Sequence, residues 1–348
     1  MTQTTTNQTT TNKDGEIFAD KAPAGKYLVN PYEEWAKAEG IPIITGAAID
    51  LMTAQVAPWA RFGVKAAFCH LDGRCDFMTV VLTELLPSSK SSLQHHLYEE
   101  VCYVLSGHGA TEITLADGTQ RVIEWGPKSL FAVPLNAKYR HRNDSREPAR
   151  FAAVSDLRYI MNLYRSEALI FGTDVPFPER ETKDLVCDLA TLSLDETAGT
   201  SRTRALTPAD GSIAADVVEI AAGSYLAASR QVQGAHIFGV DGDGYTLVFA
   251  DDAGNHVRMD WRHGVVCGAG GMRFHQHFNA GAKPARYLGV ELGSRRYPMF
   301  RSRRAAYGDK TVYAAGSATI PLTEQDPRID ALWQDTLQKN GVQLKPHG

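Results

Sequence analysis

The strongest constraint on the fold is a spacing pattern that occurs twice in the chain. Trp125 precedes Asn143 by 18 residues in a first block, and Trp261 precedes Asn279 by 18 residues in a second. A Pro-Ala-Arg-aromatic sequence begins five residues after each of these asparagines. Matched spacing of this kind indicates one structural unit that is repeated. A chain of 348 residues is also long enough for two domains.

Short strand-like segments separated by turn residues fill both blocks. Residues 110–115 and 119–125 flank an Ala-Asp-Gly turn, which predicts a hairpin. Strands and helices do not alternate, which favours an antiparallel barrel or jelly roll over a parallel sheet. The sequence therefore predicts an all-β protein. The expected strands are 77–85, 101–105, 110–115, 119–125, 129–134 and 149–154 in the first block, and 215–220, 244–249 and 285–292 in the second.

Composition and capping residues outside the blocks set the expected domain boundaries. The first 14 residues are polar and rich in Thr, which predicts a disordered tail. Asn30 and Asp326 are suitable N-caps for helices at 32–39 and 327–339, each with a proline in its first turn. The expected parts are a tail at 1–14, an arm with the first β domain at 15–160, a linker at 161–213, a second β domain at 214–295, and an extension with a helix at 296–348.

A dense histidine and glutamate motif lies in the first block. The segment from Gln94 to Gly107 resembles the first cupin motif, which is His-x-His, three or four residues, Glu, six residues and Gly. His96 takes the second His position and Glu100 the Glu position, whereas Gln94 stands in place of the first His. The resemblance implies a bicupin with two double-stranded β-helix (jelly-roll) barrels and a few peripheral helices, distantly similar to the gentisate dioxygenase group.

The second cupin motif has a His four residues before an Asn. In the first block this position holds Tyr139, and His141 lies two residues further along. In the second block it holds His275, with His277 two residues further along. The resemblance thus covers about residues 76–156 and 214–293.

The second block keeps less of the first motif. Ser229 and Gln231 take its two His positions, and we assign His236 to the Glu position. Together with His275 and His277, this residue makes a second and weaker candidate metal site.

The residues of the first block suit metal chemistry. Residues two apart in a strand face the same way, so Gln94 and His96 share a face, as do Tyr139 and His141. His96, Glu100 and His141 then supply two imidazoles and a carboxylate, a set that suits Fe(II) and tolerates Mn, Ni or Zn. Gln94 is a weak fourth ligand in this hypothesis.

The two tyrosines near this motif are the candidate catalytic residues. Tyr139 either ligates the metal or donates a hydrogen bond to substrate, and Tyr98 lies beside the site. Simpler interpretations remain open for most of these residues. His96 and Tyr98 also suit core packing, Glu100 can pair with Arg140 or Arg142, and His141 and His277 can orient a neighbour.

The favoured function is a metal-dependent enzyme, by resemblance an Fe(II) dioxygenase that uses O₂ on a small hydroxylated or carboxylated substrate, aromatic or not. One alternative is a non-oxidative metal cupin, which would be an isomerase, a decarboxylase or a lyase. Another is a metal-poor cupin that binds a ligand or stabilises an assembly.

Charge and composition exclude other classes. A net charge of −4 gives no basic surface for nucleic acid. No apolar run approaches a membrane span, and the N-terminus does not resemble a signal peptide. An odd number of cysteines, five, without C-x-x-C spacing predicts reduced thiols and a cytoplasmic protein. Cupin barrels associate through sheet edges and terminal arms, so we expect a homodimer or larger, with residues 15–60 and the last helix packed on a partner or on the other domain.

Overall fold

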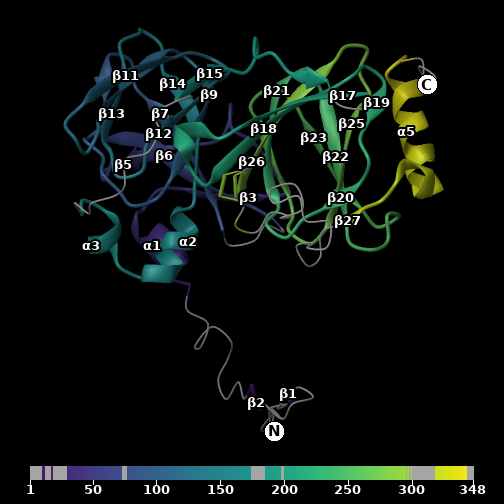
Figure 1. Cartoon of the computed structure of the whole chain (residues 1–348), viewed down its shortest axis with the longest axis horizontal. Coiled ribbons are helices and arrows are strands. Elements are labelled where there is room, and N and C mark those ends of the chain that lie inside the picture. The colour runs from purple at the N-terminus through teal and green to yellow at the C-terminus, as the bar shows by residue number, and fades with distance from the viewer. Residues whose placement is uncertain are drawn as a thin grey trace, which may run out of the picture.

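Two β-barrels lie side by side in the computed structural model (Figure 1). It describes residues 10–11, 17–18, 30–72, 77–173, 185–196, 200–294, 296–297, 299 and 318–342. Each barrel consists of two sheets that enclose a core of buried side chains. In each barrel we call the sheet that faces the other barrel the inner sheet, and the opposite one the outer sheet. The predicted all-β, two-barrel class is confirmed.

Barrel 1 has an inner sheet in the order β15-β12-β9-β14-β7-β6-β3, with β5 also paired to β6, and an outer sheet in the order β11-β10-β13-β8. These strands are β3 (Ile43–Gly46), β5 (Ala57–Trp59), β6 (Val64–Leu71), β7 (Thr79–Leu85), β8 (Ser89–Lys90), β9 (Glu100–Ser106), β10 (Gly109–Thr114), β11 (Gln120–Trp125), β12 (Ser129–Val133), β13 (Lys138–Asn143), β14 (Ala149–Ser155) and β15 (Val186–Asp188).

Barrel 2 has an inner sheet in the order β16-β17-β18-β26-β21-β24-β4, and an outer sheet in the order β23-β22-β25-β20-β27, with β19 also paired to β25. These strands are β4 (Ala48–Asp50), β16 (Asp195–Glu196), β17 (Ser201–Leu206), β18 (Ile213–Ile220), β19 (Ser224–Tyr225), β20 (Ser229–Arg230), β21 (Ala235–Asp241), β22 (Gly244–Phe249), β23 (Val257–Trp261), β24 (Val265–Ala269), β25 (Phe274–Asn279), β26 (Ala285–Leu292) and β27 (Ala318–Thr319).

The two inner sheets pack against each other through one hydrophobic cluster. Val101 and Tyr103 of β9 belong to the same buried cluster as Phe238 of β21 and Leu288 of β26. The alternate residues of β9, such as Cys102, face the interior of barrel 1. Inner strands are therefore buried on both faces, which explains why all seven residues of β7 are buried. The contact between the barrels is a continuous core.

A segment near the start of each barrel crosses to the other one. Strand β4, which lies between β3 and β5 of barrel 1, pairs with β24 of barrel 2, and β15, between the barrels, pairs with β12 of barrel 1. Each crossing is held by an equivalent arginine. The Arg150 guanidinium donates to carbonyl oxygens within residues 51–54, and that of Arg286 donates to carbonyl oxygens within residues 189–192. The prediction that part of the arm packs on the other domain is confirmed for β4.

Helices cover one end of barrel 1 and the outer sheet of barrel 2 (Figure 1). Helices α1 (Pro31–Ala38), α2 (Leu157–Tyr164) and α3 (Glu167–Ile170) add Trp35, Met161 and Ile170 to the core of barrel 1. Helix α5 (Pro327–Lys339) places Trp333 against Tyr225 and Phe278, with ring centroids 5.3 and 5.6 Å apart. Two short 3₁₀ turns are η2 (Pro208–Asp210) and η3 (Leu322–Glu324).

Most of the expected elements are present. Both predicted helices form, with Asn30 accepting from the Glu33 backbone and Asp326 from the Arg328 backbone as N-caps. Strand β6 was not predicted, whereas β13 contains Tyr139 and His141 on one face, as expected, with charged residues on its other face. Within the described residues no helix has the length and apolarity to cross a membrane.

Two expectations about the segments outside the barrels need correction. The region 161–213 was expected to be a linker between the domains. Its described residues instead contribute β15 to barrel 1 and β17 to barrel 2. Within the expected disordered tail, strand β1 (Thr10–Thr11) pairs with β2 (Ile17–Phe18), and the rest of 1–14 lies outside the described residues. The expected homodimer stays a prediction.

Candidate active site

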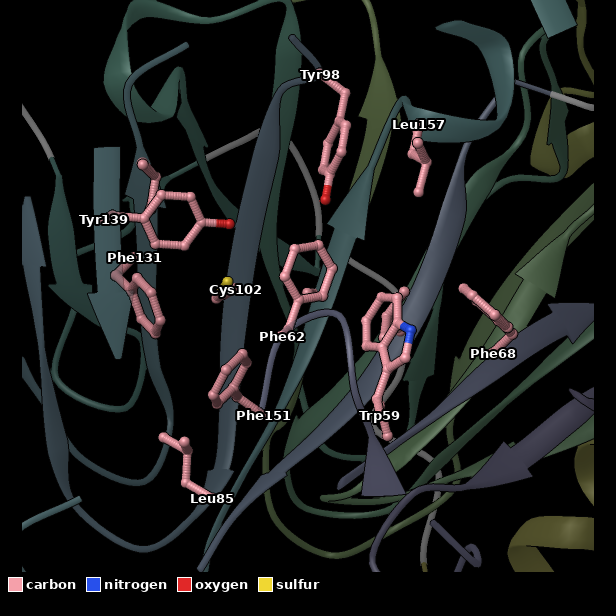
Figure 2. Close-up of a cluster of buried hydrophobic side chains, with 14 of the residues drawn as sticks. Trp59, Phe62, Phe68, Leu85, Tyr98, Cys102, Phe131, Tyr139, Phe151 and Leu157 are labelled. Carbon is pink, nitrogen blue, oxygen red and sulfur yellow. The ribbon is translucent and has the colours of Figure 1, made fainter. Parts of the chain in front are cut away.

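A small cavity inside barrel 1 lies beside the residues of the first motif. Its polar wall includes Gln94, Glu100 and His141, and its volume of about 20 Å³ holds roughly one water molecule. Figure 2 shows the aromatic side chains around this interior, among them Phe62 and Phe151, which line the cavity. Groups in this cavity are shielded from solvent, so their electrostatic interactions and hydrogen bonds are stronger than they would be at the surface.

The Tyr139 hydroxyl lies at the centre of the polar groups. It is 2.6 Å from His96 Nε2 and 3.1 Å from Glu100 Oε1. All three side chains are buried. Burial raises the pKa of Tyr139 well above its ordinary value, so this residue remains a phenol at neutral pH.

The neighbours of His96 determine which ring nitrogen carries hydrogen. His96 Nδ1 is 3.0 Å from the Tyr98 carbonyl oxygen, which can only accept, so Nδ1 carries the hydrogen. Burial lowers the pKa of His96 to about 3, so the ring is neutral and Nε2 offers a lone pair. That lone pair is directed at the Tyr139 hydroxyl.

Glu100 completes a chain of three polar groups. The single hydrogen of Tyr139 serves either Glu100 or the lone pair of His96, and a proton on Glu100 allows both contacts to be hydrogen bonds. Burial raises the pKa of Glu100 to about 7, while the Tyr139 hydroxyl and the Cys102 thiol oppose this rise. Glu100 therefore exchanges a proton close to neutral pH.

Gln94 and Tyr98 also make defined contacts beside these groups. Gln94 forms a backbone bridge with Tyr139, and its amide nitrogen donates to Ser91 Oγ at 3.4 Å, which leaves the amide oxygen for other partners. The Tyr98 ring stacks on His96 with centroids 3.5 Å apart and an interplanar angle of 1°. Tyr98 was a candidate catalytic residue, and this contact supports a positioning role that keeps the His96 ring in place.

The structure does not assemble the predicted ligand set of His96, Glu100 and His141. Among the described residues no three His, Cys, Asp or Glu side chains lie close enough to hold a metal ion together. The reason is the pleat of β13: Tyr139 lies opposite Gln94, and His141 is two residues further along, about 6.6 Å away. His141 Nδ1 instead contacts Thr111 Oγ1 at 2.9 Å, and burial lowers the pKa of His141 to about 3.

A different set converges on one point. The Tyr139 oxygen lies within 2.6 to 3.1 Å of His96 Nε2 and Glu100 Oε1, and Gln94 lies opposite Tyr139 on the neighbouring segment. One imidazole, one carboxylate, one phenol and one amide are oxygen and nitrogen donors of the kind that divalent first-row metals accept. His96, Glu100 and Tyr139 therefore bring three such donor groups close together, with Tyr139 in place of His141.

Structural comparisons agree with the two-barrel architecture. An oxalate decarboxylase of Lactobacillus farciminis in a formate complex matches with a TM-score of 0.51 and 14% identity, over 71% of this chain and 86% of that one. An oxalate decarboxylase variant of Bacillus subtilis matches with a TM-score of 0.50 and 15% identity, over 72% and 78%. The chain has a bicupin fold. No family model matches it, and no curated protein matches it.

Identities this low establish the fold alone and leave the activity of this chain open. The distant similarity to the gentisate dioxygenase group stays a prediction.

In barrel 2 of the bicupin, the assignment of His236 is wrong. His236 pairs with Val290, whose side chain lies in the core between the barrels, so His236 is on the outward face of β21. Ala235 faces the interior at the position equivalent to Glu100. The sequence contained the necessary signal, because Glu100 precedes its motif glycine by seven residues and so does Ala235.

The other two histidines of the second candidate site do face the interior. The rings of His275 and His277 are 5.4 Å apart, and His277 Nδ1 contacts Thr246 Oγ1 at 2.8 Å. Burial lowers the pKa of His275 to about 4. Without His236, only these two imidazoles remain of the predicted set.

Barrel 2 also contains a buried carboxylate that sequence reasoning missed. Glu291 of β26 accepts from the amides of Gln231 at 2.7 Å and Gln233 at 3.0 Å. Glu291 lies on the same inward face of β26 as Ala285 and Tyr287. The alternation of side chains along a strand could have predicted this from the sequence. In barrel 2 the buried carboxylate therefore comes from another strand than in barrel 1.

Proposed function

We propose that barrel 1 is the active site of a metal-dependent, non-oxidative enzyme that acts on a small organic acid, with decarboxylation as the favoured reaction. The observation that carries this proposal is the Tyr139 hydroxyl held between His96 Nε2 and Glu100, whose carboxyl group lines a small cavity. A proton donor of this kind is what a decarboxylation needs once carbon dioxide has left.

The proton balance of the reaction is simple. The bond between the carboxylate and its carbon breaks, carbon dioxide leaves, and the electron pair stays on the remaining carbon. Glu100 supplies the proton that this carbon takes up, and water returns one to Glu100 afterwards. A carboxyl group with a pKa of about 7 is suited to both steps near neutral pH.

His96, Tyr139 and Gln94 would hold the divalent ion, and Glu100 beside them keeps its proton for the reaction. When bound, the ion would polarise a carboxylate oxygen of the substrate as a Lewis acid. The sequence analysis favoured Fe(II), and the same oxygen and nitrogen donors accept Mn equally well. The aromatic wall keeps bulk water from the reacting carbon.

Two considerations favour this reaction over a dioxygenase. The similar solved structures include oxalate decarboxylases, one of them in complex with formate, which supports a small carboxylate as substrate. The cavity of about 20 Å³ must expand for any substrate, and a dioxygenase would have to admit O₂ as well.

The test is a turnover assay with oxalate, malonate, oxaloacetate and gentisate, using protein loaded with Mn(II) or Fe(II). Release of carbon dioxide and consumption of O₂ are recorded together. We expect carbon dioxide without net O₂ consumption from one of the aliphatic acids, and loss of this activity in Tyr139→Phe. Tyr287→Phe, which changes a buried tyrosine of barrel 2, is the matched control and should remain active. Stoichiometric O₂ consumption with gentisate would instead support the dioxygenase.

A further inference from the structure

Thr111 connects His141 to Trp125 behind the cavity. The Trp125 indole Nε1 donates to Thr111 Oγ1 at 3.0 Å, and His141 Nδ1 is 2.9 Å from the same oxygen. The Thr111 side chain is 0% exposed. Among the described residues these are the two hydrogen-bond partners of its hydroxyl.

The direction of these bonds follows from what each group can do. An indole N–H only donates, so Thr111 accepts from Trp125. If Thr111 also accepted from His141, its own hydrogen would be buried without an acceptor, which is strongly unfavourable. Thr111 therefore donates to His141 Nδ1, and the ring hydrogen of His141 is on Nε2. A protonated ring would carry a hydrogen there as well, so the conclusion holds in either charge state.

His141 Nε2 lies across the ring from Nδ1, and His141 forms part of the cavity wall next to Gln94 and Glu100. We propose that the Trp125–Thr111–His141 chain fixes His141 as an N–H donor that binds an oxygen of a substrate carboxylate, and that His141 is not a metal ligand. The identity of the bound group rests on the function proposed above, whereas the hydrogen position rests on the hydrogen bonds alone.

Barrel 2 contains the same chain. Trp261 donates to Thr246 Oγ1 at 3.1 Å, and Thr246 Oγ1 is 2.8 Å from His277 Nδ1, so the same three residue types are present. The same argument places the ring hydrogen of His277 on Nε2. The carboxylate role is assigned to His141 because His141 lines the cavity beside Gln94 and Glu100.

The hydrogen position is measured by nitrogen-15 NMR of histidine-labelled full-length protein, with His141→Gln used to assign the signals. We expect the wild-type His141 Nε2 to be the protonated nitrogen. Thr111→Val should release this constraint, whereas Thr111→Ser, which keeps the hydroxyl, should not. A wild-type His141 with its hydrogen on Nδ1 would overturn the proposal.

Carboxylate binding is measured by titration with formate. Formate should shift the His141 Nε2 signal, and Thr111→Val should weaken binding by at least about tenfold, the value of one hydrogen bond to a charged group. Thr246→Val in barrel 2 is the matched control and should bind as wild type. Equal formate affinity in Thr111→Val and wild type would refute the carboxylate role. Formate binding with the expected hydrogen position, but without any turnover, would refute the decarboxylase and leave this inference intact.

Discussion

The two barrels of the bicupin share their supporting residues and differ in their interior chemistry. Asn143 donates to the Glu147 carbonyl at 2.7 Å, and Asn279 donates to the Lys283 carbonyl at 2.8 Å. The Trp–Thr–His chains also have closely similar distances in the two barrels. These repeated residues tie loops and strands together. Their repetition indicates that they support the fold of both barrels, and in barrel 1 the Trp–Thr–His chain also orients the proposed substrate-binding residue His141.

The motif positions differ between the barrels. Glu100 of barrel 1 is replaced by Ala235, and the Tyr139 position is taken by His275. Only barrel 1 has a carboxylate in the motif position and a phenol hydrogen-bonded to it. This difference locates the proposed chemistry in barrel 1, while the similarities explain the common fold.

The outer sheets differ as well. Phe278 of barrel 2 lies beneath helix α5, and the equivalent residue of barrel 1 is Arg142, which forms an ion pair with Glu112 at 3.4 Å. Apolar residues on one outer face require a cover, and charged residues on the other remain stable beside water.

The largest expected effect comes from making barrel 1 resemble barrel 2 at the motif carboxylate. Glu100→Ala should lower the decarboxylation rate by about a thousandfold, because a positioned acid contributes of that order. Initial rates under saturating substrate measure this loss. Glu291→Gln, which neutralises the buried carboxylate of barrel 2, should retain activity within about twofold, a change too small for a catalytic acid. Equal losses of activity in both variants would show that the catalytic role is not confined to the carboxylate of barrel 1.

Metal content provides the second test of the comparison. We expect about one divalent ion per chain, bound in barrel 1. His96→Ala should lose it, whereas the double variant His275→Ala/His277→Ala should retain it. Elemental analysis of purified protein measures both. Two ions per chain, with one lost in the double variant, would show that barrel 2 also binds metal.

Third, we expect Trp333→Ala to lower the free energy of unfolding by about 4 kcal/mol, because it removes a buried indole that packs on Tyr225 and Phe278. Arg140→Ala on the uncovered outer sheet of barrel 1 should cost less than about 0.5 kcal/mol. Urea denaturation followed by tryptophan fluorescence and circular dichroism compares the two. Similar costs would contradict the distinction between the two outer faces.

A fourth prediction concerns the equivalent arginines at the two crossings. Arg150 pairs with Glu84 at 2.7 Å and Arg286 with Glu219 at 2.7 Å, and both bind the crossing segment. Arg150→Ala and Arg286→Ala should each cost about 3 kcal/mol, because a partly buried carboxylate and several carbonyl groups lose their partner. Chemical denaturation should show that the two variants lose amounts of unfolding free energy that agree within about 1 kcal/mol, since the surroundings of the two arginines differ slightly. A large inequality would mean that one crossing dominates stability.

The last prediction is a pH dependence of stability that arises from Glu100 in barrel 1. Its pKa in the folded state is about 7, above the ordinary value of 4.5, so the folded protein binds the extra proton between these values. Stability from this group is fully present below about pH 4.5 and is lost as the pH rises through 7. The loss should be about 3 kcal/mol. Urea midpoints across this range should fall more in wild type than in Glu100→Gln, and parallel curves would contradict the raised pKa.

Local patterns in the sequence determined much of this protein. The repeat predicted two equivalent β units, and the capping residues Asn30 and Asp326 predicted both helix starts. The motif spacing placed His96 and Glu100 together. These features depend on residues close in the chain, where strand alternation and helix capping act directly.

Other features were decided only by the tertiary structure, because they depend on strand pairing between distant segments. The pairing of β13 placed Tyr139 rather than His141 beside His96 and Glu100. The register of β21 turned His236 away from the interior, since a shift by one residue moves a side chain to the other face. The crossings of β4 and β15 likewise arise from pairings that no local pattern specifies. Local sequence thus identified the elements, and long-range register decided which side chains meet.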